Sequence, residues 1–235
     1  MKRVLITGAS RGIGEGIAKR FSAEGAYVVG TATKKPELEQ GFINQWIEAD
    51  FSCNQSLEYY CNCLSGLEGF DICINNAGIN IIKPLEDVSS QDYFRIQKIN
   101  LESPYLISRA LLNGMKSRGG GKIINIASIW GCITKKHRSL YSTMKTGIVG
   151  MTRALAVELA PSNILVNAVS PGFTMTDLTK NSLSIDQINL LTKDIPLGRF
   201  AEVDEIASIV TFLASEQNTY LTGQNIVVDG GFTTI

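Results

Sequence analysis

A tyrosine and a lysine stand four residues apart in the second half of the sequence, with a serine upstream. Tyr141 and Lys145 fit a helical pattern, so their side chains share one face. A free phenol has a pKa of about 10 and releases its proton poorly at neutral pH, whereas a nearby cation lowers that pKa. Ser128 closes an apolar run and adds a hydroxyl that can hold a carbonyl or alcohol oxygen. The three side chains predict a proton-transfer site for oxidising alcohols or reducing carbonyls.

Such a site needs a hydride carrier, and a glycine-rich segment predicts where one binds. Residues 2–7 have the pattern of a short buried strand, and a helical pattern runs from about residue 13 to 24. Glycines between them allow a tight turn and a close backbone approach to a pyrophosphate at the helix N-terminus. The spacing Gly8, Gly12, Gly14 differs from the G-x-G-x-x-G fingerprint. Taken alone, it is also compatible with a structural turn.

Strand and helix patterns alternate along the whole chain, without repeats or low-complexity linkers. Strands are expected at 2–7, 26–31, 46–49, 70–75, 121–127, 163–169 and 225–228. Helices are expected at 13–24, 55–66, 91–117, 140–159 and 202–214. The segment after Ala32 is short, so the helix there is expected to be about one turn. The alternation predicts one Rossmann-type, doubly wound α/β domain over residues 1–235, with a mostly parallel seven-stranded sheet and helices on both faces.

The candidate polar residues lie where that fold binds ligands. In a parallel sheet, ligands sit outside the carboxyl ends of the strands. Five candidates lie at the carboxyl ends of predicted strands, namely Gly8, Asp50, Asn75, Ser128 and Pro171. This convergence supports one binding site independently of any single motif.

The composition excludes several other classes of protein. Lys+Arg and Asp+Glu balance at 22 each, which argues against a surface for nucleic acid or acidic membranes. No apolar run approaches 18 residues and no signal-peptide pattern is present, so we expect a cytoplasmic protein. The five cysteines are an odd number, Cys61 and Cys63 lack a zinc-ligand spacing, and His137 is the only histidine. We therefore expect reduced thiols and no metal site.

The motifs taken together resemble those of the short-chain dehydrogenase/reductase family, and within it the bacterial 3-oxoacyl-[acyl-carrier-protein] reductases. The matching elements span nearly the whole sequence in a fixed order, which makes the set specific. They are residues 7–14, Asp50, residues 75–78, Asn100, Ser128, Tyr141 with Lys145, residues 171–172 and residues 228–231.

The resemblance implies a role for each of four catalytic residues. Tyr141 is the general acid in reduction and the base in oxidation. Lys145 lowers the phenol pKa and binds the nicotinamide ribose, while Ser128 orients the carbonyl oxygen. Asn100 holds a water near Lys145 and completes a proton relay. Taken singly, each residue also fits a structural role, such as packing, a solvated charge or a cap.

The resemblance also implies the cofactor contacts. Asp50 accepts from the adenine amino group, residues 76–78 pass the adenine ribose, and residues 171–176 bind the nicotinamide carboxamide. For Asn75 we favour a structural role in tying strands together. The complete set is Gly8, Ser10, Arg11, Gly12, Ile13, Gly14, Thr33, Asp50, Phe51, Asn76, Ala77, Gly78, Tyr141, Lys145, Pro171, Gly172, Thr174 and Thr176.

The charge at the end of the second predicted strand favours NADP(H) over NAD(H). NAD-specific sites place an acid there, but residues 29–35 contain no carboxylate. Arg11, Thr33 and Lys34 could hold the 2′-phosphate instead. Both cations also fit a role as solvated surface charges.

Substrate and assembly are the least determined features. Residues 175–199 have the pattern of a substrate lid. The leading interpretation is reduction of a 3-oxoacyl thioester, which the resemblance implies can be bound to a carrier. The alternative is a dehydrogenase or reductase of a sugar, polyol or sugar-derived ketone, and the remote alternative is a non-catalytic nucleotide sensor. His137 fits an exposed basic loop better than catalysis, and Trp130 fits the cleft and the core equally. By resemblance we expect a homotetramer, or at least a dimer.

Overall fold

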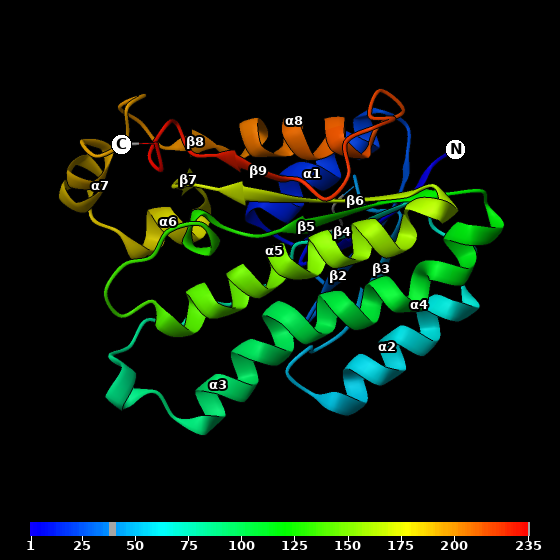
Figure 1. The fold of residues 1–235 in the computed structure, drawn as a ribbon, viewed down its shortest axis with the longest axis horizontal. Helices are drawn as coiled ribbons and strands as arrows, with labels where there is room; N and C mark the ends of the chain where they lie inside the picture. Colours follow the sequence, from blue (N-terminus) through cyan, green and yellow to red (C-terminus); the bar gives the residue numbers. More distant parts are fainter. Residues whose placement is uncertain (38–40, 235) are drawn as a thin grey trace.

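Seven parallel strands form the central layer of the computed structural model, which describes residues 1–37 and 41–234 (Figure 1). Within those residues the order is β3-β2-β1-β4-β5-β6-β9. The strands are β1 (Arg3–Thr7), β2 (Tyr27–Ala32), β3 (Gln45–Glu48), β4 (Ile72–Asn75), β5 (Gly121–Ile126), β6 (Ile164–Pro171) and β9 (Asn225–Val228). All residues of β6 are buried, as expected for a parallel strand covered on both faces. Strand order reverses beside β1, so the carboxyl ends of β1 and β4 flank the switch point.

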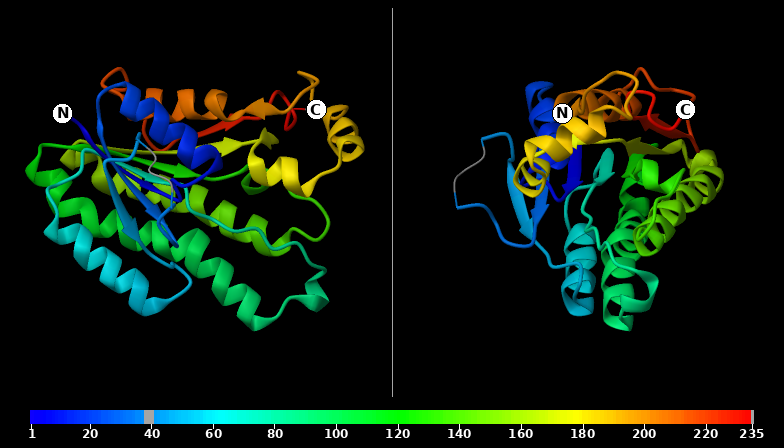
Figure 2. Two further views of the ribbon diagram at one scale, coloured as in Figure 1. Left: turned by 180° about the vertical axis from the view of Figure 1, so that it is seen from behind. Right: turned by 90° about the vertical axis from the view of Figure 1, so that its left-hand side faces the viewer.

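Helices cover both faces of this sheet. Two of them, α1 (Gly12–Ala23) and α8 (Val203–Ala214), pack on one face around Phe21 and Val210 (Figure 2). The opposite face carries α2 (Asn54–Gly66), α4 (Ser103–Ser117) and α5 (Ser139–Leu159). The predicted doubly wound Rossmann-type fold is confirmed.

Short elements complete the carboxyl-end side of the sheet. A small parallel sheet, which the sequence did not predict, pairs β7 (Thr174–Met175) with β8 (Ala201–Glu202). Between its strands, α6 (Asp177–Ser182) and α7 (Ile185–Thr192) extend beyond the main sheet (Figure 1). The remaining short helices are η1 (Leu85–Asp87), η3 (Ile129–Gly131) and η4 (Ala160–Ser162).

The single helix predicted for residues 91–117 is wrong in one respect. A capping box at Ser89 starts α3 (Ser90–Gln97), but a π-helical turn, η2 (Lys98–Glu102), follows before α4 begins. A π turn accommodates one extra residue per turn and often occurs at functional sites. Apolar periodicity alone does not reveal it, because the helix axis continues.

The reduced helix predicted after Ala32 lies partly outside the described residues. Residues 38–40 are outside, and the described residues 33–37 and 41–44 form turns and bends without a helix.

A buried ladder of amide side chains joins the sheet to the helices below it. Asn75 at the end of β4 donates to Asn125 Oδ1 on β5 at 2.8 Å and to Ser108 Oγ on α4 at 3.1 Å. Asn125 donates in turn to Thr152 Oγ1 on α5 at 2.9 Å. The structural role predicted for Asn75 is confirmed, since its amide ties two strands and a helix together.

Breaking this ladder should destabilise the fold. Asn125→Leu removes the acceptor of Asn75 and the donor to Thr152, which leaves buried polar atoms unpaired. We expect a loss of about 1–3 kcal/mol in the free energy of unfolding, measured by urea denaturation. Asn113→Leu, at an exposed position on α4, is the control and should stay within about 0.5 kcal/mol of the wild type. Equal losses in the two variants would contradict the assignment.

Candidate active site

The first two turns of α5 carry Tyr141 and Lys145 on one face. The Lys145 ammonium nitrogen lies 5.6 Å from the centroid of the Tyr141 ring. Lys145 is buried and donates to the Ile126 carbonyl oxygen at the end of β5, at 2.7 Å. Ser128 follows β5, and its hydroxyl lies near enough to Tyr141 to act against the rise of the phenol pKa. The structure thus brings together the three residues that the sequence singled out first.

Burial dominates the acidity of both groups. It raises the pKa of Tyr141 above its usual value of 10, and the Ser128 hydrogen bond and the Arg138 charge offset only part of that rise. The sequence predicted a lowered phenol pKa, so its direction was wrong for the free protein. Burial lowers the pKa of Lys145 to about 8. The phenol therefore keeps its proton at neutral pH and can donate it.

Asn100 reaches this site through the π turn. Its Oδ1 accepts from Ile79 N at 2.9 Å, and its Nδ2 donates to Ile79 O at 2.8 Å. A Cβ added at Gly78 would lie 3.6 Å from Asn100 Oδ1 and 3.8 Å from Lys145 Nζ, so the three groups are neighbours. The Asn100 amide is thus committed to the backbone of the loop after β4, and it positions that loop beside Lys145.

The glycine turn after β1 has the geometry of a phosphate site. Gly8 and Gly12 have φ values of +64° and +58°, where a side chain would be strained. A Cβ on Gly14 would lie 2.2 Å from Gly8 O, so only glycine permits this approach of helix to turn. Helix α1 starts at Gly12, and Arg11 supplies no side-chain cap. Its first N–H groups lack intrahelical partners, which fits a dinucleotide pyrophosphate.

The loop after β4 braces this turn. Asn76 Nδ2 donates to Thr7 O and Gly8 O, both at 3.0 Å. Thr7 Oγ1 accepts from the backbone N–H of Asn76 and Ala77, also at 3.0 Å. The side chain of Asn76 therefore holds the turn in shape. Sequence reasoning gave Thr7 no role, although a threonine just before the first glycine was a visible signal.

The loop after β6 lies against the same turn. Pro171 ends β6, and a Cβ on Gly172 would lie 2.7 Å from Asp229 Cβ. Thr174 Oγ1 donates to Gly172 O at 3.2 Å, and the Thr176 side chain caps α6. A Cβ on Gly12 would lie 3.5 Å from Thr176 Cγ2. The predicted nicotinamide and pyrophosphate segments are therefore adjacent.

The predicted adenosine end lies at the carboxyl ends of β2 and β3. Asp50 Oδ1 accepts from Ser52 N at 2.9 Å and Ser52 Oγ at 2.7 Å, which lowers the pKa of Asp50. Phe51 is buried and packs edge-on against Tyr60, with ring centroids 5.3 Å apart. The backbone of Phe51, rather than its buried ring, is therefore left to contact the cofactor. Ser10 and Ile13 are partly buried in the glycine turn.

Sequence reasoning missed one acid at this end. Glu48 ends β3, opposite Ala32 in the register, and its Oε1 accepts from Lys35 N at 2.9 Å. It lies outside residues 29–35, the stretch in which the sequence showed no carboxylate. Only strand pairing brings it beside Thr33, and Thr33 and Arg11 are both exposed. The negative charge of Glu48 therefore has to be weighed against the positive charge of Arg11 at the predicted 2′-phosphate site.

Two neighbours of the catalytic residues have clear placements. Trp130 is buried, with its ring centroid 6.4 Å from those of both Phe173 and Phe232. His137 is exposed in the basic loop, as expected, with a φ of +66°.

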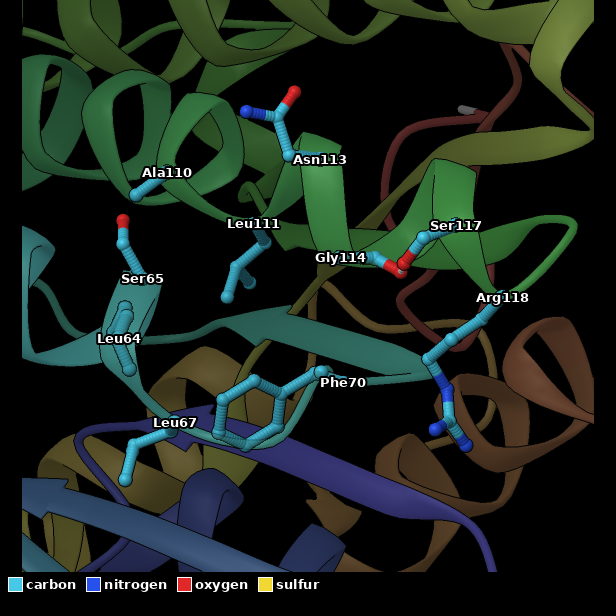
Figure 3. Close-up of a pocket in the computed structure, with 11 residues that line it drawn as sticks. Leu64, Ser65, Leu67, Phe70, Ala110, Leu111, Asn113, Gly114, Ser117 and Arg118 are labelled. Carbon is cyan, nitrogen blue, oxygen red and sulfur yellow. Dashed lines mark hydrogen bonds between the residues drawn. The ribbon is translucent and has the colours of Figure 1, made fainter.

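A groove on the described surface lies elsewhere. It has a volume of about 380 Å³ and lies between α2 and α4, with Leu64, Phe70, Leu111 and Arg118 among its lining residues (Figure 3). None of the predicted site residues lines it. The candidate site is therefore defined by converging chemistry at the strand ends rather than by cavity size.

The described residues lack the features of a metal site or of a membrane span. They contain no group of three or more His, Cys, Asp or Glu side chains placed to hold a metal ion. None of their helices combines the length and apolarity that a membrane crossing requires.

Comparisons with known proteins agree with this geometry. A family model described as enoyl-(acyl carrier protein) reductase matches residues 8–233. The 3-oxoacyl-[acyl-carrier-protein] reductase FabG of Vibrio cholerae is 36% identical over 236 residues, which are 98% of this chain and 96% of that protein.

Solved structures extend the agreement to three dimensions. A short-chain type dehydrogenase/reductase from Mycobacterium marinum has a TM-score of 0.89 at 36% identity, covering 100% of this chain and 96% of its own. A Beutenbergia cavernae protein assigned as an NAD(P) dependent gluconate 5-dehydrogenase has a TM-score of 0.94 at 29% identity, covering 100% and 97%; NADP is bound to it at low occupancy. The chain therefore belongs to the short-chain dehydrogenase/reductase family, a family of NAD(P)-dependent oxidoreductases.

Proposed function

We propose that this protein uses NADPH to reduce a ketone to a secondary alcohol, with a 3-oxoacyl thioester as the leading substrate. The observation that carries the proposal is the cluster of Tyr141, Lys145 and Ser128: the buried Lys145 ammonium lies 5.6 Å from the Tyr141 ring on one helix face, and Ser128 is near the phenol. The glycine turn and the loop after β6 meet nearby and fit a dinucleotide. Named FabG relatives support the thioester, and the NADP-bound neighbour supports NADP(H).

The residues divide the chemistry between them. Bound NADPH supplies the hydride. Ser128 and Tyr141 donate hydrogen bonds to the ketone oxygen, and Tyr141 then transfers its proton to that oxygen. Lys145 stabilises the resulting phenolate and binds the cofactor ribose. Asn100, fixed on the π turn, positions the loop beside Lys145 and holds the water that restores the proton.

The raised phenol pKa keeps Tyr141 in the protonated form that reduction uses. A protonated tyrosine is an acid, which reduction requires, whereas oxidation requires the phenolate. At neutral pH the free protein therefore starts in the form that reduces a ketone.

The lid segment supports an acyl substrate. Residues 175–199 include α6 and α7, and α7 exposes Ile185 and Leu190, which are 68% and 63% accessible. Exposed apolar side chains on a short helix next to the site suit an acyl chain. Lys135 and Lys136 are exposed in the loop that precedes α5. Their positive charge suits the docking of an acidic carrier.

A sugar-acid ketone is the second candidate substrate. The structure with the TM-score of 0.94 is that of a protein assigned as a gluconate 5-dehydrogenase. A panel of acetoacetyl thioesters and sugar ketones, followed by NADPH absorbance, separates the two. Turnover of a thioester alone supports the leading proposal, turnover of a sugar ketone alone supports the second, and cofactor binding with no turnover on any ketone contradicts both.

We also propose that the protein is a cytoplasmic homotetramer or homodimer. Helices α4 and α5 expose Tyr105 and Val157, at 50% and 80%, and Phe212 and Val227 are exposed on α8 and β9. Two such faces suit two-fold contacts. Light scattering at micromolar concentration should find a dimer or tetramer, and a monomer would contradict the proposal.

Removing the phenol hydroxyl should abolish most turnover. Tyr141→Phe should lower kcat about 10²- to 10⁴-fold, because the proton donor is gone. NADPH affinity, measured by fluorescence titration, should change little. Tyr220→Phe, at a side chain 95% exposed, should match the wild type. If kcat of Tyr141→Phe stayed within a few fold of wild type, the assignment would fail.

Activity should fall in mild alkali. The cationic form of Lys145 is the one that stabilises the phenolate. Because its pKa is about 8, Lys145 loses its proton as the pH rises through that value. We expect kcat/KM for reduction, which reports free-enzyme pKa values, to decline above about pH 8. Lys145→Arg keeps its charge, so its lower activity should show no such decline near pH 8. A flat wild-type profile up to pH 10 would be inconsistent with this role.

Opposite charges at the adenosine end should have opposite effects. Arg11→Ala should lower kcat/KM for NADPH about tenfold, because a charge-assisted contact with the 2′-phosphate is lost. Glu48→Gln should raise it, because a carboxylate that repels the phosphate is neutralised. NADH, which lacks that phosphate, is the internal control in both variants. Equal effects on the two cofactors would show that neither residue senses the phosphate.

A further inference from the structure

One cation beside the catalytic tyrosine has no assigned role. Arg138 is the residue before α5 and stands three positions before Tyr141, one turn away. It is half-buried, and its guanidinium carbon lies 4.9 Å from the centroid of the Trp130 ring. Its charge is close enough to the phenol to lower the pKa of Tyr141. Arg138 and Lys145 thus stand on either side of Tyr141 along the helix.

This placement is unfavourable unless something else binds there. A cation at a helix N-terminus meets the positive end of the helix dipole. Burial adds a second penalty, seen in the lowered pKa of Arg138. A carboxylate partner would relieve both, yet within residues 1–37 and 41–234 no hydrogen bond or ion pair engages the guanidinium. Among these residues its N–H donors have no protein acceptor, so they can bind another group.

The stacking partner is itself held in place. Trp130 follows Ser128 by two residues, and Ser128 Oγ accepts from Trp130 N at 3.2 Å. Phe173, from the loop after β6, and Phe232 pack edge-on against the Trp130 ring. The guanidinium therefore stacks on a ring that is packed between two other rings. The backbone of Trp130 is hydrogen-bonded to Ser128, the residue proposed to bind the carbonyl oxygen.

We infer that Arg138 is a substrate-recognition residue, whose guanidinium binds a second oxygen of the substrate next to the ketone held by Ser128 and Tyr141. The inference rests on the proposed ketone reduction and narrows its substrates to those with another acceptor oxygen near the ketone. That oxygen belongs to the thioester carbonyl of a 3-oxoacyl group or to the carboxylate of an oxo acid. Arginine suits both, because it presents paired donors in a fixed plane.

Three methyl ketones that differ in the group next to the ketone test this role with the full-length protein and NADPH. S-acetoacetyl-N-acetylcysteamine carries a thioester carbonyl, acetoacetate carries a carboxylate, and 2-pentanone carries no second oxygen. Arg138→Gln should lower kcat/KM for the first, the second or both by about tenfold to a hundredfold more than for 2-pentanone. The loss should fall mainly on KM. Where 2-pentanone reacts too slowly, its competitive inhibition constant replaces kcat/KM.

Two companion variants make the result specific. Arg138→Lys keeps the charge but not the paired donors, so it should recover part of the discrimination. Arg153→Gln removes an exposed arginine about 22 Å further along the same helix, and it should retain the wild-type ratios.

The outcomes separate this inference from the proposed function. A greater loss with the thioester identifies its carbonyl as the bound oxygen, and a greater loss with acetoacetate identifies a carboxylate. Equal losses on all three ketones, or no loss, would overturn the role of Arg138 while leaving ketone reduction intact. A wild-type protein that reduces no ketone in either panel would instead overturn the proposed function.

Discussion

The single hydrogen bond from the buried Lys145 ammonium to the Ile126 carbonyl oxygen organises the rest of the site. A buried cation is costly unless it is paired and hydrogen-bonded, and this contact fixes α5 against the end of β5 at 2.7 Å. Tyr141 lies one turn earlier and Ser128 two residues beyond Ile126, so both are thereby held near each other. Burial also depresses the lysine pKa to about 8, so the position that secures the helix makes the cation titratable.

Much of this arrangement could be predicted from the sequence because it depends on local patterns. Periodicity located the strands, the glycine spacing located the turn, and the i to i+4 spacing placed Tyr141 beside Lys145. What failed depends on environment or on distant pairing. The phenol pKa rises because burial outweighs nearby charges. Glu48 reaches the adenosine end only through the register of β3 with β2.

Several predicted contact residues turn out to build the site as much as to face it. The Asn76 amide donates to the carbonyl oxygens of Thr7 and Gly8, and the Asn100 amide is hydrogen-bonded to the backbone N–H and carbonyl oxygen of Ile79. A motif shows that such residues matter but not which atoms they use. Side-chain direction is set by neighbours far away in the chain, and no single spacing encodes it.

Because of the π turn at Lys98–Glu102, the number of residues in this segment cannot change without disturbing its neighbours. One residue fewer there would restore a continuous α-helix, but everything on one side of the deletion would rotate by about 100° relative to the other. Either the Asn100 amide would leave Ile79, or α4 would present a different face to the sheet. This stretch should therefore tolerate substitutions far better than insertions or deletions, even though it lies within a long helical run.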